Sequence, residues 1–199
     1  EDGLQTLCNR TSDNPPKDIA ARMERDQLEA VKYPADGKLM GDWKAGEKLA
    51  QSGRGMTWSD KAGVPGGGNC YNCHQIAPTE TSFGTIGPSL YQFGKIRGNT
   101  AEIQKYTYGK IWNAKAFNLC SAMPRFGHAN ALTENQIRDL VALLLDPQSP
   151  VIQQRLQDCL PVLLGDDDVA QLFGTCVDRE VYVIATGPTN DVLTPENVR

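Results

Sequence analysis

Apolar residues at helical spacing define the clearest predicted element of this chain. Segment 132–147 carries them at intervals of three and four positions: Ile137, Leu140, Val141 and Leu144. Thr133 and Gln136 have the spacing of a capping box at the start of this run, and Pro147 follows its end. The pattern therefore predicts one helix with a single buried face.

Two further segments have helical patterns. In residues 41–53, Asp42 is placed to cap a helix. The positions that follow at helical spacing are Trp43, Gly46, Leu49 and Ala50. A glycine inside a helix costs about 1 kcal/mol relative to alanine, so we expect a close crossing with another helix at Gly46. Residues 100–117 predict a third helix, with these buried positions: Ile103, Tyr106, Ile111 and Trp112.

The stretches between and after these helices are less regular. Residues 75–94 and 118–131 are rich in turn-forming residues and are predicted to be loops. Residues 151–164 have a helical pattern up to their proline, and residues 179–187 form a short β-like run.

These patterns divide the chain into three parts. Residues 1–40 are turn-rich apart from a polar helix predicted over 19–32, and we expect them to form an N-terminal extension. Residues 41–147 contain the three apolar helices and form the predicted main domain. The composition changes from residue 148 onward, so residues 148–199 are expected to form a C-terminal extension. The predicted fold class is all-α.

Composition and charge narrow the function classes. The chain has 199 residues, of which 40% are hydrophobic and 22% charged, which is ordinary for a globular protein. Its net charge of −4 and the lack of a Lys/Arg cluster argue against binding to nucleic acid. No apolar run approaches the roughly 18 residues that a membrane span needs. The sequence has no initiating methionine and no recognisable signal peptide, so we expect a mature, processed chain.

The cysteines indicate an oxidising compartment. Two of the six form a Cys-x-x-Cys pair, and the other four are Cys8, Cys120, Cys159 and Cys176. These four cysteines are enough for two disulfides, which persist in oxidising compartments outside the cytoplasm. Four cysteines can pair in three ways. We favour Cys159 with Cys176, which share the C-terminal extension, and Cys8 with Cys120. The alternative is that these are free, buried thiols.

The sequence "CYNCH" carries the strongest chemical signal. Cys70 and Cys73 are followed directly by His74, the pattern of covalent haem c attachment. Two sulfurs at this spacing reach the two vinyl groups of a porphyrin, and the histidine becomes the proximal iron ligand. A thioredoxin-like dithiol would need a βαβ unit, and a structural zinc site would need a second pair of ligands. The sequence predicts neither.

A haem with two axial ligands needs a second ligand, and Met123 is the best candidate. It lies in a loop before the last predicted helix, and Pro124 holds the residue before it extended. A thioether ligand raises the reduction potential of the iron. The other candidates are Lys side chains and these residues: Met23, Met40, Met56 and His128. His128 is the leading rival.

The segment "IGPSL" supplies two further candidates for the proximal side. The carbonyl of Pro88 can accept a hydrogen bond from Nδ1 of His74, which would fix the tautomer of the imidazole. Leu90 could press on the porphyrin. The alternative is a plain turn followed by a core leucine.

The order helix, CxxCH, GPxL, helix, Met-Pro and helix resembles class I cytochrome c over residues 41–147. Within that class, "SAMPRFG" and "LTENQIRDLVALLLDPQSPV" resemble the SoxX subunit of the SoxAX sulfur-oxidation cytochrome. The resemblance implies thioether bonds at Cys70 and Cys73 and iron ligation by His74 and Met123. SoxX proteins usually end near the matched "DPQSPV", whereas this chain continues, and its first 40 residues have no match. We expect that both extensions could bind a partner subunit.

The resemblance also implies a function. SoxAX is an L-cysteine S-thiosulfotransferase, which joins thiosulfate oxidatively to a cysteine of the carrier protein SoxYZ. The bond-forming site is expected on the SoxA partner, and this chain would accept electrons at its one haem and pass them to a soluble cytochrome. No catalytic residue is expected in this chain, and its location is expected to be periplasmic. The alternatives are a stand-alone periplasmic shuttle cytochrome and a haem-based sensor, which would need a labile distal ligand.

Overall fold

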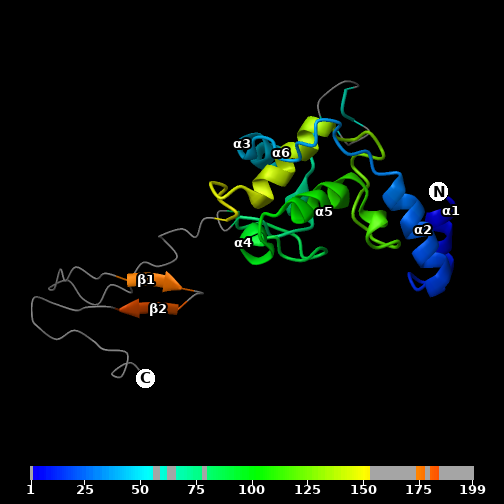
Figure 1. The fold of residues 1–199 in the computed structure, drawn as a ribbon, viewed down its shortest axis with the longest axis horizontal. Helices are drawn as coiled ribbons and strands as arrows, with labels where there is room; N and C mark the ends of the chain where they lie inside the picture. Colours follow the sequence, from blue (N-terminus) through cyan, green and yellow to red (C-terminus); the bar gives the residue numbers. More distant parts are fainter. Residues whose placement is uncertain are drawn as a thin grey trace, which may run out of the picture. The chain divides into compact units, whose positions relative to one another are not determined.

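The computed structural model describes residues 2–55, 59–61, 66–77, 80–152, 174–177 and 180–183. Internal contacts divide the chain into two compact units, Glu1–Gln153 and Gln154–Arg199. In the described part of the first unit all regular secondary structure is helical, as predicted (Figure 1). None of the helices among the described residues is long and apolar enough to cross a bilayer.

Helices α3 (Trp43–Gln51) and α6 (Glu134–Leu145) lie side by side and form the most extensive helix–helix packing among the described elements (Figure 1). The side chain of Asp42 caps α3 by accepting from the backbone N–H of Lys44, as predicted. A Cβ atom at Gly46 would lie 2.1 Å from the carbonyl oxygen of Asp139. The predicted close crossing is therefore confirmed, since only a residue without a side chain lets the two backbones approach this far.

Helix α6 has the predicted start and the predicted buried face. Thr133 and Gln136 form a reciprocal capping box, in which each side chain accepts from the other residue's backbone N–H. The buried residues of the helix are Ile137, Leu140, Val141, Ala142, Leu143, Leu144 and Leu145. Burial extends beyond the predicted stripe because α3, α4 (Phe93–Arg97) and α5 (Ala101–Trp112) all pack against this helix.

Helix α5 (Ala101–Trp112) is shorter than the predicted helix over 100–117. It ends because Asn113 is extended, with its side chain accepting from the N–H of Lys115, and a 3₁₀ turn, η2 (Ala114–Ala116), follows. The prediction that Tyr106 is buried is wrong: its side chain is 42% exposed and packs edge-on against Phe117. Tyr108, which is fully buried, takes the core position instead.

The first forty residues contain two helices, α1 (Gly3–Arg10) and α2 (Lys17–Glu29). The sequence analysis did not predict α1, and it placed α2 at 19–32. No residue of α2 is buried, which agrees with its prediction as a polar helix. A small apolar cluster of Leu4, Cys8 and Leu119 joins this segment to the rest of the unit.

Two of the four remaining cysteines are paired as predicted. Cys8 and Cys120 form a disulfide with a Cα–Cα distance of 5.5 Å. The predicted pairing of Cys159 with Cys176 stays a prediction, because Cys159 and the side chain of Cys176 lie outside the described part of the chain.

In the second unit the described residues form a two-stranded antiparallel sheet. Strands β1 (Gly174–Val177) and β2 (Glu180–Val183) pair with Cys176 opposite Val181. Strand β2 confirms the start of the β-like run predicted from residue 179. The helix predicted over 151–164 lies outside the described residues, apart from a turn at its start. The predicted division into an N-terminal extension, a main domain and a C-terminal extension stays a prediction, because the two compact units do not test it.

Candidate functional site

The sequence "CYNCH" forms a tight turn on the surface of the core. The 3₁₀ helix η1 (Cys70–Asn72) follows Asn69, whose left-handed backbone (φ 46°) redirects the chain. The backbone N–H groups of Cys73 and His74 both donate to the carbonyl of Cys70, at 3.1 and 2.9 Å. This turn holds two free, partly buried thiols and an imidazole within five consecutive positions.

The environment of the first thiol argues against a dithiol oxidoreductase. Burial raises the pKa of Cys70 to about 12, so the sulfur is a protonated thiol at neutral pH. Redox-active Cys-x-x-Cys motifs do the reverse and stabilise a thiolate. Among the described residues the only strands are β1 and β2, far along the chain from the motif, so the βαβ setting of a thioredoxin site is not found there.

The imidazole of His74 is held by the next loop. Its Nδ1 atom lies 2.7 Å from the carbonyl oxygen of Pro88, the contact that the sequence predicts. Because a carbonyl oxygen only accepts, Nδ1 is the donor in this contact. Nε2 is then the ring nitrogen left for a metal ion, and the Pro88 carbonyl fixes the orientation of the ring. The role of Pro88 and His74 in holding a haem stays a prediction.

Three backbone hydrogen bonds fasten this loop to the motif. They run from Gly84 N to Tyr71 O at 2.8 Å, from Gly87 N to Cys73 O at 2.8 Å, and from Leu90 N to Gln75 O at 2.7 Å. The hydroxyl of Ser89 also donates to the side chain of Gln75. The position of the Pro88 carbonyl is therefore set by the backbone on both of its sides.

Gly87 is a site residue that the sequence analysis missed. A Cβ atom there would lie 2.1 to 2.7 Å from three ring atoms of His74, so any larger residue would displace the imidazole. The only signal in the sequence is a glycine next to Pro88, and it does not say which ring that glycine approaches.

Leu90 and Met123 are both partly buried and pack, like Cys70, against the main hydrophobic core. The Met123 N–H donates to the hydroxyl of Ser121 at 3.2 Å, and Pro124 beyond it is exposed. The two free thiols and the imidazole with its Nδ1 engaged have the chemistry that covalent attachment of a haem c needs. Ligation by Met123 stays a prediction.

The other methionine candidates differ in their surroundings. Met23 packs in the small N-terminal cluster, Met40 packs, like Met123, against the main core, and Met56 lies outside the described residues. His128 is exposed, and its ring lies edge-on to Trp112 at 5.9 Å.

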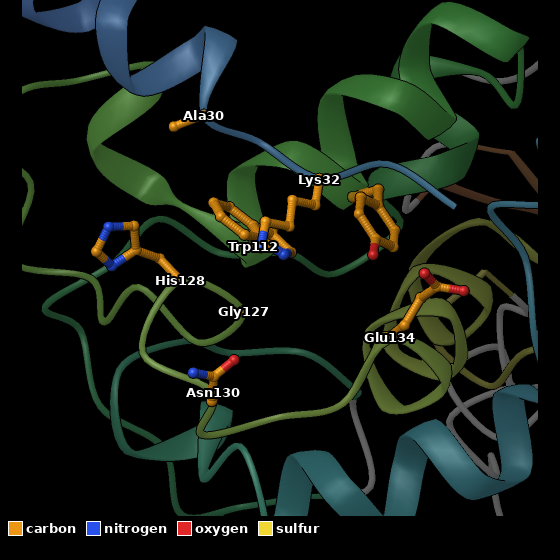
Figure 2. A pocket seen from close by; sticks show the side chains of 8 residues that line it. Ala30, Lys32, Trp112, Gly127, His128, Asn130 and Glu134 are labelled. Atoms are coloured by element: carbon orange, nitrogen blue, oxygen red, sulfur yellow. The ribbon is translucent and has the colours of Figure 1, made fainter. Parts of the chain in front are cut away.

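His128 lines a separate cavity of about 430 Å³ (Figure 2). The other lining residues are Ala30, Lys32, Tyr108, Trp112, Gly127, Asn130 and Glu134. None of the residues predicted to bind the haem is among them.

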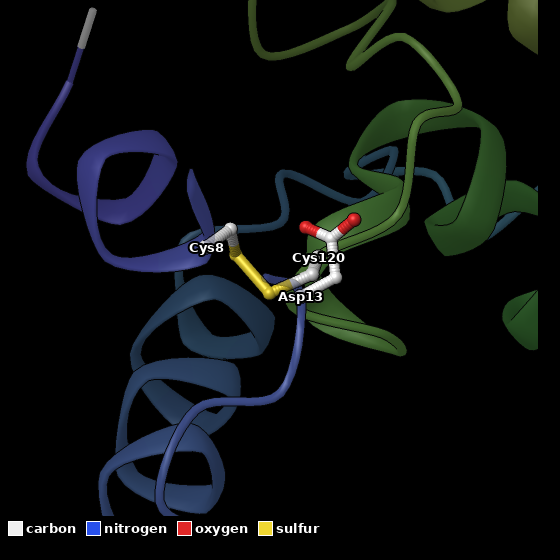
Figure 3. A group of neighbouring side chains, drawn as sticks. All are labelled: Cys8, Asp13 and Cys120. Carbon is white, nitrogen blue, oxygen red and sulfur yellow. A yellow bond between two sulfur atoms is a disulfide. The ribbon is translucent and has the colours of Figure 1, made fainter. Parts of the chain in front are cut away.

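A second cluster of ligand-type side chains is not a metal site. Cys8, Asp13 and Cys120 bring their ligand atoms within 4.8 Å of one another (Figure 3). Both sulfurs are joined in the disulfide, so neither is a thiolate that could bind a metal ion.

Comparison with known proteins gives one informative match. No protein-family model matches the chain. A protein of Aquifex aeolicus described as an uncharacterized lipoprotein is 37% identical over 155 residues, which cover 76% of this chain and 72% of that relative.

Proposed function

This chain belongs to the same family as the Aquifex aeolicus lipoprotein, and on that premise we propose that it works outside the cytoplasm. From its CxxCH motif we further propose that it is a covalent haem protein that accepts and passes on electrons. Two observations support the location. The relative's name implies export to a membrane surface, and the Cys8–Cys120 disulfide suits an oxidising compartment. A periplasmic location is the specific form of this proposal.

One observation carries the proposal of a haem: the hydrogen bond between His74 Nδ1 and the Pro88 carbonyl, inside a CxxCH motif with two free thiols. Cys70 and Cys73 would hold the group covalently. His74 would offer Nε2 to the iron, with its ring oriented by Pro88 and by the close approach of Gly87.

Met123 is the proposed second axial ligand. A haem bound by imidazole and thioether supplies a one-electron carrier of raised potential without an open coordination position. Met123 and Leu90 both pack against the main core, and Leu90 would press on the bound porphyrin. Residues 41–147, centred on the α3–α6 crossing, would then form a class I cytochrome c domain.

The specific role we propose is that of a SoxX-type subunit. The chain would accept electrons while a SoxA-type partner joins thiosulfate to a cysteine of SoxYZ, and would pass them to a soluble cytochrome. The "SAMPRFG" loop and the sequence of α6 support this assignment.

A stand-alone shuttle cytochrome is the second candidate, and one observation favours it. The N-terminal segment does not project as a free arm: a disulfide and several polar contacts bind it to its own domain. A SoxX-type subunit would therefore have to bind its partner through other surfaces.

Substitution of the axial ligand tests the electron-carrier proposal. In the haem-loaded chain, Met123→Ala should open the ferrous iron to carbon monoxide, and the matched variant His128→Ala should not. If His128→Ala opens the iron and Met123→Ala does not, the ligand assignment is wrong.

Purification of the tagged protein from its native host separates the two roles. A second haem subunit that co-purifies at equal stoichiometry supports the SoxX-type role. A monomer that transfers electrons at full rate supports the shuttle.

A further inference from the structure

The N-terminal helices contact the segment of the chain that carries Met123. Helix α2 packs against η2, and the disulfide joins α1 to Cys120, three positions before Met123 (Figure 3). The disulfide connects residues 112 positions apart in sequence. The N-terminal helices are therefore attached to the loop of Met123 by one covalent bond, and polar contacts before and after Met123 add to it.

An ion pair provides the attachment after Met123. The guanidinium of Arg125 lies 2.6 Å from the carboxylate of Asp2, across 123 positions of sequence. Asp2 also caps α1 by accepting from the N–H of Gln5, so its carboxylate is oriented by the helix that it begins.

Further polar contacts hold the segment before Met123. The carboxylate of Glu24 in α2 accepts from the N–H of Leu119 at 2.9 Å. Gln27 accepts from the side chain of Asn113 at 3.0 Å. The ammonium of Lys115 bridges the carbonyl of Leu119 and the side chain of Gln5. Both N-terminal helices therefore contribute contacts.

The segment between η2 and α6, residues 117–133, has little regular secondary structure. No helix occurs between η2 and α6, a stretch that the structure describes throughout. Its local bonds are turn contacts, such as Ser121 N to Asn118 O at 3.0 Å. A loop of this kind keeps one conformation only if contacts from elsewhere offset its conformational entropy.

We propose that residues 2–29 act as a clamp that positions Met123, with Cys8, Asp2 and Glu24 as positioning residues. This inference rests on the proposed function, because it assigns the clamp to the thioether ligand of the haem. The disulfide restrains the loop before Met123 and the Asp2–Arg125 pair restrains it after. Release of either restraint lets the loop move, so that the thioether leaves its position for a larger fraction of the time.

The test uses the haem-loaded full chain and two readouts of ligation. One is the charge-transfer band of thioether bound to ferric iron, and the other is the rate of carbon monoxide binding to the ferrous form. In the double variant Cys8→Ser/Cys120→Ser we expect a weakened band and carbon monoxide binding at least about tenfold faster. In Asp2→Asn, where asparagine still caps α1, we expect about two- to fivefold faster binding.

Asp36→Asn is the matched control. Asp36 is also an N-terminal carboxylate paired with an arginine, but its partner Arg138 lies on α6. This variant should keep both the band and the binding rate of the wild type. If Asp2→Asn and Glu24→Ala behave like Asp36→Asn, the clamp is overturned, and these two variants decide the question even if the disulfide variant does not fold.

The outcomes separate this inference from the proposed function. A wild-type chain without covalent haem overturns both. A wild-type chain with haem and a thioether band, but with no response to any clamp variant, overturns only the clamp.

Discussion

The Nδ1 atom of His74 lies 2.7 Å from the carbonyl oxygen of Pro88. The two residues are held together by backbone bonds between the loop of Pro88 and the CxxCH turn, not by this contact alone. The result is an imidazole of fixed tautomer next to two free thiols. Fixed orientation of this kind is what a permanent metal ligand needs.

The Gly87→Ala variant tests how closely this loop fits the imidazole. The new Cβ atom would fall 2.1 Å from the nearest ring atom of His74, so the ring or the loop must move. We expect loss of the Nδ1–Pro88 bond and destabilisation by about 1–3 kcal/mol, the usual cost of overpacking. Nitrogen NMR of His74 reports the tautomer, and chemical denaturation reports the stability.

Gly3→Ala is the control for this variant, since nothing lies within 4 Å of the Cβ position of Gly3. A Gly87→Ala protein with an unchanged His74 signal and unchanged stability would contradict the close fit.

The Gly46→Ala variant tests the helix crossing by the sign of its effect. In an open helix the substitution would stabilise by about 1 kcal/mol. Here the Cβ atom would lie 2.1 Å from the Asp139 carbonyl, so we expect the free energy of unfolding to fall by about 1–3 kcal/mol. Denaturant unfolding of the variant and the wild type gives the sign directly, and a gain in stability would be incompatible with the crossing.

Removal of the disulfide should lower stability through the unfolded state. The Cys8–Cys120 link closes a loop with a sequence separation of 112. The chain-entropy relation for a loop of this length gives a loss of about 4–5 kcal/mol in Cys8→Ser/Cys120→Ser. Urea unfolding measures it, and a loss below about 1 kcal/mol would mean that the unfolded chain is already compact at this point.

The ion pair of Asp36 predicts a pH dependence of defined sign. Acceptance from the Lys38 N–H, and then the Arg138 guanidinium, hold the pKa of Asp36 below its usual 3.8. Its stabilising effect is therefore complete above that value and is lost as pH falls through the lower pKa of the folded state. The difference in unfolding free energy between wild type and Asp36→Asn should shrink between neutral pH and about pH 2. A difference that grows in acid would reverse the assignment.

The sequence predicts those features that depend on local order. The capping box of Thr133 and Gln136 and the cap at Asp42 each follow from residues a few positions apart, and the close approach at Gly46 follows from a glycine inside a helical pattern. The His74–Pro88 contact was also predicted, because the motif and the GPxL turn are near each other in the chain.

Two features that depend on distant partners, the burial of Tyr108 and helix α1, were not predicted. Tyr106 and Tyr108 fit a helix equally well, and only the packing of α5 against α6 and the N-terminal segment selects Tyr108 for the core. Helix α1 is short and has only two buried residues, Leu4 and Cys8, so it carries too weak a periodic signal. Its existence depends on contacts more than a hundred positions away, such as the pair of Asp2 with Arg125.

The intact mass of the protein purified from its native host tests the central claim most directly. The account predicts a polypeptide heavier than its amino acids by the mass of one haem, and no such addition in the Cys70→Ser/Cys73→Ser variant. A wild-type chain that weighs only as much as its amino acids would contradict the account.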